Sequence, residues 1–284
     1  AGGTIVANTN GSGGGEDNTK KDTDVIVPDD TTAAIDDTQS SGTADPTNTG
    51  GNTSTTKPQG TAQKSKADIA KLYNDALNKT KAYKGDVKVK RVEGVTTTVT
   101  KLALVKSIAQ SMLPNTYPET REGTFKNGVA TADARTKKGE EKKDRDPGAK
   151  LAEYIPPPEG KSAKLSAAGI KDAKYTAVGS GYKLEITLVQ EAGDGINYVP
   201  PYHSSVMDTL AMSDEELKPF SVINATTTYS GATITMQVNS NGLVTSLSIL
   251  EIVNVTGKVT YGNSSQGLEA ILDGEWKQDI TFTY

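Results

Sequence analysis

The sequence predicts an α+β domain over residues 65–284, in which a long, strongly curved antiparallel β-sheet packs with two N-terminal helices. Three observations indicate this fold. The composition changes abruptly at Ser65, two helix-like stretches follow, and the carboxy-terminal third alternates apolar and polar residues between Gly- and Asn-rich turns. Residues 1–64 are therefore assigned to a tether, and residues 65–284 to a single α+β domain.

The first 64 residues are rich in Gly, Ser, Thr, Asn and Asp, and the first aromatic residue of the chain is Tyr73. Such a segment buries too little apolar surface to offset an ordering cost of about 1 to 2 kcal/mol per residue. It is predicted to be disordered. Its short apolar run, Val25–Val27, favours a coil over a docking peptide, and Gly11–Gly15 lacks the lysine of a phosphate-binding loop.

The first helix is predicted by a capping signal and by its apolar spacing. Ser65 and Asp68 form the S-x-x-D pattern of a capping box, and an apolar face that includes Leu72 and Leu77 extends the helix to about Lys84. Both leucines are therefore expected in the core.

A short strand and a second helix are expected next. Residues 86–93 alternate in the manner of a half-buried strand that Gly94 ends. A helix capped near Thr98 or Thr100 and ended by Pro114 is then expected, because apolar residues recur there at helical spacing.

The rest of the chain is predicted to be strands. Asn127-Gly128 is the signal of a tight hairpin, and Gly179–Gly181 predicts a second one. The connections between the later strands are too short for helical crossovers, so the sheet should be antiparallel. The clearest strands are expected over 222–229, 233–238, 243–256 and 268–284.

Charge and residue usage argue against several classes of site. The net charge of -4 makes nucleic acid an unsuitable partner, since phosphate binding needs clustered Lys and Arg. The chain has no cysteine and one histidine, His203, which excludes thiolate and multi-histidine metal sites. The acidic clusters lack the spacing of a calcium loop. No metal and no cofactor is predicted.

One segment, 197–205, combines two tyrosines, two prolines, the histidine and two serines. The prolines stiffen it, which favours preorganised contacts with a ligand or partner. The alternative is an extended covering over a sheet edge, with the tyrosines packed against it. On the first interpretation the candidate ligand-binding residues are Tyr198, Tyr202 and His203, together with Tyr154, which precedes a similar run of prolines.

No catalytic residue set is predicted. Gly179–Gly181 contains a serine but lacks the G-x-S-x-G spacing of a nucleophile, and His203 has no acidic partner nearby in the sequence. The chain is therefore expected not to be an enzyme.

The order of the elements resembles the half-barrel family of bacterial lipoprotein chaperones and lipid-carrying cell-envelope lipoproteins. The resemblance covers residues 65–284 and rests on an amphipathic helix leading into strands, an early second helix and a run of long antiparallel strands. It implies an apolar cavity for acyl chains, enclosed by a curved sheet and its helices. The tether also resembles that of mature bacterial surface lipoproteins, where it follows a lipid-modified cysteine. Position 1 here is Ala1, so an anchor is inferred from the tether alone.

Three functions follow as hypotheses. The leading one is a non-enzymatic, extracytoplasmic binding protein, secreted or membrane-anchored and monomeric, that holds a lipid or other hydrophobic small molecule beneath the sheet. Its contact with a membrane would run only through the inferred N-terminal anchor. The second is a surface adhesion or scaffold domain with a filled core, and the third is an enzyme acting on cell-wall or glycan substrates. An apolar cavity favours the first, a close-packed interior the second, and a cleft with two facing carboxylates the third.

Overall fold

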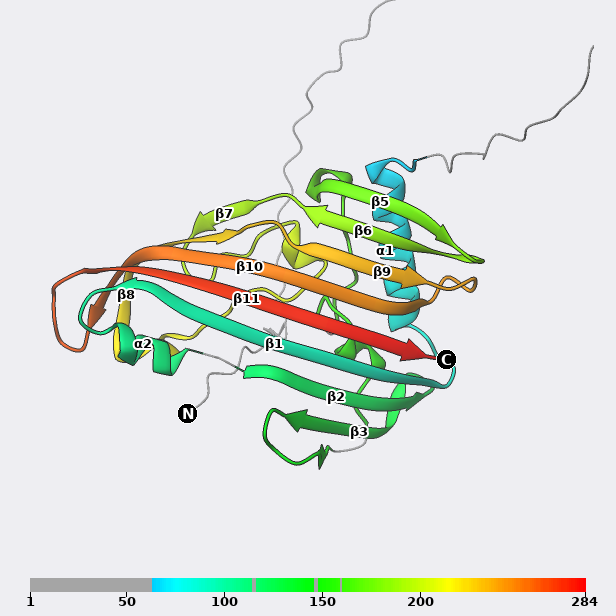
Figure 1. Ribbon diagram of the computed structural model, residues 1–284, viewed down its shortest axis with the longest axis horizontal. Coiled ribbons are helices and arrows are strands. Elements are labelled where there is room, and N and C mark those ends of the chain that lie inside the picture. Colours follow the sequence, from blue (N-terminus) through cyan, green and yellow to red (C-terminus); the bar gives the residue numbers. More distant parts are fainter. Residues whose placement is uncertain (1–62, 114–115, 146–147, 159) are drawn as a thin grey trace, which may run out of the picture. The chain divides into compact units, whose positions relative to one another are not determined.

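The computed structural model describes residues 63–113, 116–145, 148–158 and 160–284. Nearly all of the predicted tether lies outside these residues. Within them, one antiparallel sheet of eleven strands, not closed into a barrel, dominates the fold, and helices are few (Figure 1). The predicted sheet-dominated, antiparallel architecture is confirmed.

The main path of the sheet runs in the order β4-β3-β2-β1-β11-β10-β9-β6-β5, and β8 also pairs with β10 and carries β7 on its other side. The strands are β1 (Val87–Leu102), β2 (Thr116–Lys126), β3 (Val129–Lys137), β4 (Lys143–Asp144), β5 (Ile170–Val178), β6 (Gly181–Leu188), β7 (Glu191–Asp194), β8 (Phe220–Tyr229), β9 (Thr233–Val238), β10 (Val244–Tyr261) and β11 (Leu268–Thr283).

Three long strands, β1, β11 and β10, form the centre of the sheet (Figure 1). One side of β10 changes partner along its length. Its first half pairs with β9, ending at Leu250 opposite Thr233, and its second half pairs with β8, beginning at Val253 opposite Tyr229. At the β8 end of the sheet, β1, β11, β10 and β8 therefore lie side by side.

Helix α1 (Lys66–Lys81) begins as predicted. The Ser65 hydroxyl accepts the Asp68 N–H, and the Asp68 carboxylate accepts the Ser65 N–H, so the capping box is confirmed. Leu77 is fully buried, whereas Leu72 only packs at the margin of the core.

The asparagines of α1 fasten it to an extended segment of the chain. The side chains of Asn74 and Asn78 exchange hydrogen bonds of 2.8 to 3.0 Å with the backbones of Leu165 and Ala163, respectively. Residues four apart on a helix and two apart in an extended chain have nearly the same spacing, so both pairs form at once.

The predicted end of the first strand is wrong. β1 continues through Gly94, which is buried and pairs with Lys277, because β11 supplies hydrogen-bond partners on that side along the whole strand. Helix α2 (Lys106–Met112) is consequently shorter than the helix expected from Thr98.

Both predicted hairpins are confirmed. Asn127 and Gly128 have φ values of 53° and 78°, as a type I′ turn between β2 and β3 requires. Gly179 has a φ of 56° in the turn between β5 and β6. Glycine adopts this left-handed conformation most readily, because it has no Cβ.

Buried side chains form two apolar clusters on one face of the sheet, which we call the inner face. The main cluster lies against α1, and a smaller one lies against α2. The inner positions of β1 show the division, since Val87 and Val89 belong to the main cluster and Val99 to the smaller one. The two apolar regions are separated along β1 by Arg91 and Glu93.

Candidate functional site

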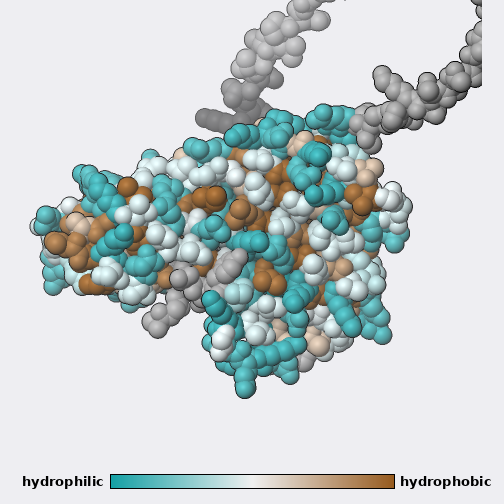
Figure 2. All heavy atoms as spheres, in the orientation of Figure 1, coloured by the Kyte–Doolittle hydropathy of each residue, from teal (hydrophilic) through white to brown (hydrophobic). Residues whose placement is uncertain are grey.

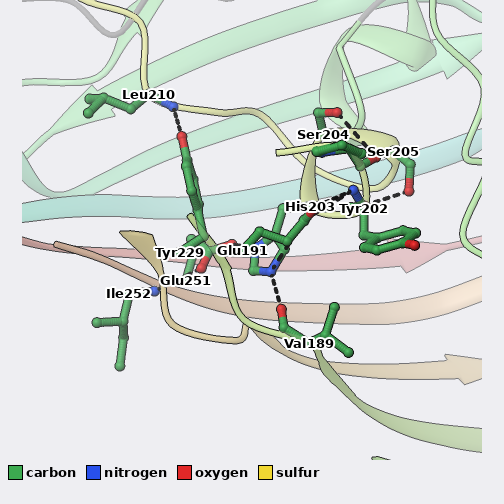
Figure 3. Close-up of polar contacts among 11 residues, drawn as sticks. Val189, Glu191, Tyr202, His203, Ser204, Ser205, Leu210, Tyr229, Glu251 and Ile252 are labelled. Carbon is green, nitrogen blue, oxygen red and sulfur yellow. Dashed lines mark hydrogen bonds and ion pairs between the residues drawn. The ribbon is translucent and has the colours of Figure 1, made fainter. Parts of the chain in front are cut away.

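The segment 197–205 is held to the sheet by a carboxylate that the sequence analysis did not single out, Glu191 of β7 (Figure 3). Both oxygens of Glu191 lie 3.0 Å from the Tyr202 N–H nitrogen, and Oε2 accepts the His203 N–H at 2.9 Å. A negative charge suits the unpaired N–H groups at the start of a helical turn, here η3 (His203–Ser205). The segment is therefore fixed by a buried side chain.

The ring of His203 is fully buried, and both of its nitrogens have partners (Figure 3). Nδ1 lies 2.6 Å from Oε2 of Glu251 on β10, and Nε2 donates to the Val189 carbonyl at 2.8 Å. A carbonyl only accepts, so Nε2 must carry a proton. Burial lowers the pKa of His203, but the hydrogen bond and charge of Glu251 outweigh burial, and the pKa lies above its ordinary value.

Glu251 and Tyr229 complete this buried group. Burial raises the pKa of the Glu251 carboxyl, and His203 opposes that rise. The ring of Tyr229 packs edge-on against His203 with centroids 5.4 Å apart, and its hydroxyl accepts the Leu210 N–H at 2.9 Å. No ring nitrogen of His203 is left to act as a general base, and the group instead joins β8, β10 and the 197–210 region.

The two tyrosines of the segment cover glycine backbone. A Cβ built on Gly193 would lie 2.3 Å from the ring of Tyr198, and one built on Gly169 would lie 2.9 Å from Cβ of Tyr202. Both tyrosines are half-buried. These contacts place them over β7 and over the turn before β5.

Tyr154 lies apart from the other three candidates. Its buried ring packs edge-on against Phe125, with centroids 5.0 Å apart, and the Arg121 guanidinium lies 4.0 Å from the ring centroid. Its hydroxyl donates to the Asp133 carboxylate. These partners belong to β2 and β3, so the structure does not bring the four predicted residues into one site.

A second polar group lies between the two apolar clusters, at positions where no site was predicted from the sequence. The Arg91 guanidinium is 2.5 Å from the Glu93 carboxylate and 3.8 Å from that of Asp208, and Gln278 Nε2 donates to Glu93 at 3.2 Å. Asp208 Oδ1 and Gln278 Oε1 are buried and have no partner among the described residues. Burial raises the pKa of Asp208 and lowers that of neighbouring Lys81 to about 8. The signal in the sequence was a break in the apolar alternation of β1, where Arg and Glu occupy inner positions.

An apolar pocket lies at the β8 end of the sheet, between the inner face and the helices α2 and α3 (Asp214–Leu217). It is partly open to solvent and has a volume of about 70 Å³, which is room for several water-sized groups. The side chains around it come from four strands, two helices and the chain near 196 and 212. They include Leu102, Ala109, Met112, Leu113, Ile196, Met212, Leu217, Phe220, Val222, Ala225, Val255, Val259, Ala270 and Leu272.

The two polar residues at the pocket already have partners. The Glu216 carboxylate accepts the N–H and the hydroxyl of Ser213 at 2.8 and 2.9 Å, and Asn224 Oδ1 accepts the Lys258 N–H at 3.1 Å. Asn197, in the predicted segment, holds one side of the pocket by exchanging two hydrogen bonds of 2.8 Å with the backbone of Met212. The predicted segment thus adjoins the pocket through a residue that was not among the candidates.

Comparison with protein-family models and with curated protein sequences gives no match for this chain. The chemistry of the pocket is therefore the best guide to function. An apolar lining binds apolar groups by removing them from water, at about 25 cal/mol per Å² of buried surface. Within the described ranges, no three His, Asp or Glu side chains come together as a metal site, and no helix is long and apolar enough to cross a membrane.

Proposed function

We propose that this protein is a non-enzymatic binding protein that holds the apolar part of a lipid or other hydrophobic ligand in the pocket between the inner face and α2 and α3. The observation that carries the proposal is the pocket lining, in which fifteen of the seventeen residues are apolar or glycine. Its two polar residues, Glu216 and Asn224, bond within the protein. A polar headgroup would therefore stay outside while the chain of the ligand enters.

The arrangement we propose is a half-barrel, with a strongly curved sheet filled by α1 at one end and by α2 and α3 at the other. The attachment of α2 supports this role. β1 pairs with β2 only as far as Val95, and beyond it Gln110 of α2 takes the place of a neighbouring strand. The side-chain oxygen of Gln110 accepts the Val99 N–H at 2.8 Å, and its nitrogen donates to the Thr97 carbonyl at 2.7 Å. The Lys106 Nζ adds a hydrogen bond of 3.3 Å to the Thr100 carbonyl. A helix of seven residues that bonds to β1 through these side chains is suited to move aside and admit a ligand.

We place the protein outside the cytoplasm, secreted or anchored to a membrane by its N-terminal tether. The support for this location is the composition of residues 1–64 and their resemblance to lipoprotein tethers. It is independent of the pocket.

A fluorescent fatty-acid probe tests the binding function. Ala109 is buried on the pocket side of α2 and Ser107 is exposed on the same helix, so Ala109→Trp and Ser107→Trp form a matched pair. We expect saturable probe binding by the parent and by Ser107→Trp, and its loss in Ala109→Trp, whose indole would fill the pocket. The denaturant midpoint of each variant controls for folding. A parent that binds no probe would favour a scaffold domain.

A further inference from the structure

Two sets of apolar side chains lie at the start of helix α2, and the part of the chain that the structure describes covers only one of them. Val105 and Ala109 pack into the smaller apolar cluster. Leu104, in the turn before α2, and Ile108, on α2, are 98% and 40% exposed. A pair of large aliphatic side chains is thus presented to solvent beside the pocket.

The backbone at Leu104 makes this exposure harder to explain by folding alone. Its φ is 65°, in the left-handed region that residues with a Cβ enter rarely. A side chain that is 98% exposed gains almost nothing from packing in return. A non-glycine residue held there without internal contacts points to a role outside the chain.

More apolar surface lies at the same end of the sheet. Val222 and Ile223 of β8 are 36% and 54% exposed, so four of the nine large exposed hydrophobic residues in the described ranges belong to this end. Ile223 lies against Gly267, in the connection between β10 and β11. Figure 2 shows apolar residues gathered at the end of the sheet where α2 and β8 lie, at the left of the view.

The turn itself carries lysines and no carboxylate, although the chain as a whole is acidic. Residues 95–113 contain Lys101 and Lys106 and no acidic residue. Lys101 pairs with Glu269 across the sheet, and acidic residues return on α3 at 214–216. Because Glu269 neutralises Lys101, Lys106 is the lysine of this turn that is available to an anion. Its aliphatic stem extends the apolar surface.

We propose that the turn between β1 and α2 docks on the surface of a lipid bilayer, with Leu104 and Ile108 inserted among the acyl chains and Lys106 at the level of anionic headgroups. The exposed side chains amount to no more than a few hundred Å², well below the roughly 800 Å² per partner of a stable protein interface. Insertion into a bilayer needs no matching surface around them. This contact is additional to the inferred N-terminal anchor, and it does not depend on the pocket being occupied.

Vesicle co-sedimentation of the full chain tests the docking. The vesicles contain phosphatidylcholine with a share of phosphatidylglycerol. Val178, 51% exposed in the β5–β6 hairpin, supplies the matched control. We expect the parent and Val178→Gln to bind alike, and the double variant Leu104→Gln/Ile108→Gln to partition at least tenfold less.

Two results would overturn the docking: no vesicle binding by the parent, or equal binding by the double variant. A parent that dimerises in sedimentation velocity, and that the double variant returns to monomer, would assign the surface to a second copy instead. The membrane docking and the ligand binding can be refuted independently of each other. Leu104 and Ile108 do not line the pocket, so the double variant should keep its affinity for the soluble fatty-acid probe. Vesicle binding without probe binding would refute the pocket function alone.

Discussion

The buried carboxylate of Glu251 and the ring of His203 lie 2.6 Å apart, although 48 residues separate them in the chain. Glu251 comes from the middle of β10, and His203 comes from the segment that covers the sheet (Figure 3). The pair gives the only histidine of the chain a packing role, because its other ring nitrogen donates to Val189. It ties a proline-stiffened segment to the centre of the sheet and leaves no imidazole nitrogen for catalysis.

The pair should make stability depend on pH. Folding raises the pKa of His203, so the stabilisation is complete below the unfolded value, about 6.5, and is lost as the pH rises through the folded value. The raised pKa of Glu251 acts in the same direction. In Glu251→Gln, only the Val189 carbonyl and the Glu191 charge still oppose burial, so the pKa of His203 should fall and the pH dependence should weaken.

The parent should have the higher unfolding free energy, and its advantage over Glu251→Gln should be largest near about pH 6. This difference should shrink toward about pH 9. Urea titrations across that range measure it. Glu275→Gln, at an exposed position of β11, is the control and should show a difference that does not change with pH. A constant difference for Glu251→Gln would contradict the coupling.

Removing one side chain of the His203–Glu251 pair should lower the unfolding free energy more than removing both. His203→Leu leaves the Glu251 carboxylate buried and unpaired, which typically costs about 3 to 5 kcal/mol. The double variant His203→Leu/Glu251→Met removes both charges of the pair, and we expect it to recover much of the loss. A double-mutant cycle from urea unfolding gives the coupling. Additive losses would show that the two side chains act independently.

Local signals in the sequence were enough to predict some elements. The capping box at Ser65 and the Asn127-Gly128 turn depend on residues within four positions of each other, and both formed as expected. The length of β1 could not be predicted in this way. Gly94 weakens a strand locally, but pairing with β11, more than 170 residues later, overrides that preference.

For the candidate site too, local features could be predicted from the sequence and long-range contacts could not. Segment 197–205 was recognisable from its composition, but its anchors are Glu191 and Glu251, whose positions follow from the order of the strands. The pocket residues read in the sequence as ordinary apolar strand positions. Only the change of β10 from β9 to β8 as its partner brings them under α2 and α3. A pattern of single residues carries no information on that change.

Gln110 should control how readily α2 opens. Gln110→Leu removes the partners of the Val99 N–H and the Thr97 carbonyl, and an unpaired buried backbone group costs about 1 to 3 kcal/mol. We expect faster release of the fatty-acid probe in stopped-flow displacement, with a smaller change in global unfolding. Gln110→Glu keeps an acceptor for the Val99 N–H but loses the donor to the Thr97 carbonyl. Its rate of probe release should therefore lie between those of the parent and Gln110→Leu. Unchanged rates in both variants would mean that α2 does not gate the pocket.

Leu104 should be a residue whose loss does not weaken the fold. At a φ of 65°, a left-handed conformation costs a residue with a Cβ about 1 to 2 kcal/mol, and glycine avoids that cost but loses more chain entropy on folding. We therefore expect Leu104→Gly to raise the unfolding free energy by up to about 1 kcal/mol. Leu104→Ala keeps the strained backbone and removes only an exposed side chain, so its stability should match the parent within about 0.5 kcal/mol. Both variants should bind vesicles equally poorly, because both remove the inserted side chain. If Leu104→Gly instead lowered the unfolding free energy by more than about 1 kcal/mol, the side chain would have a packing role in the protein, and its conformation could not be attributed to an external surface.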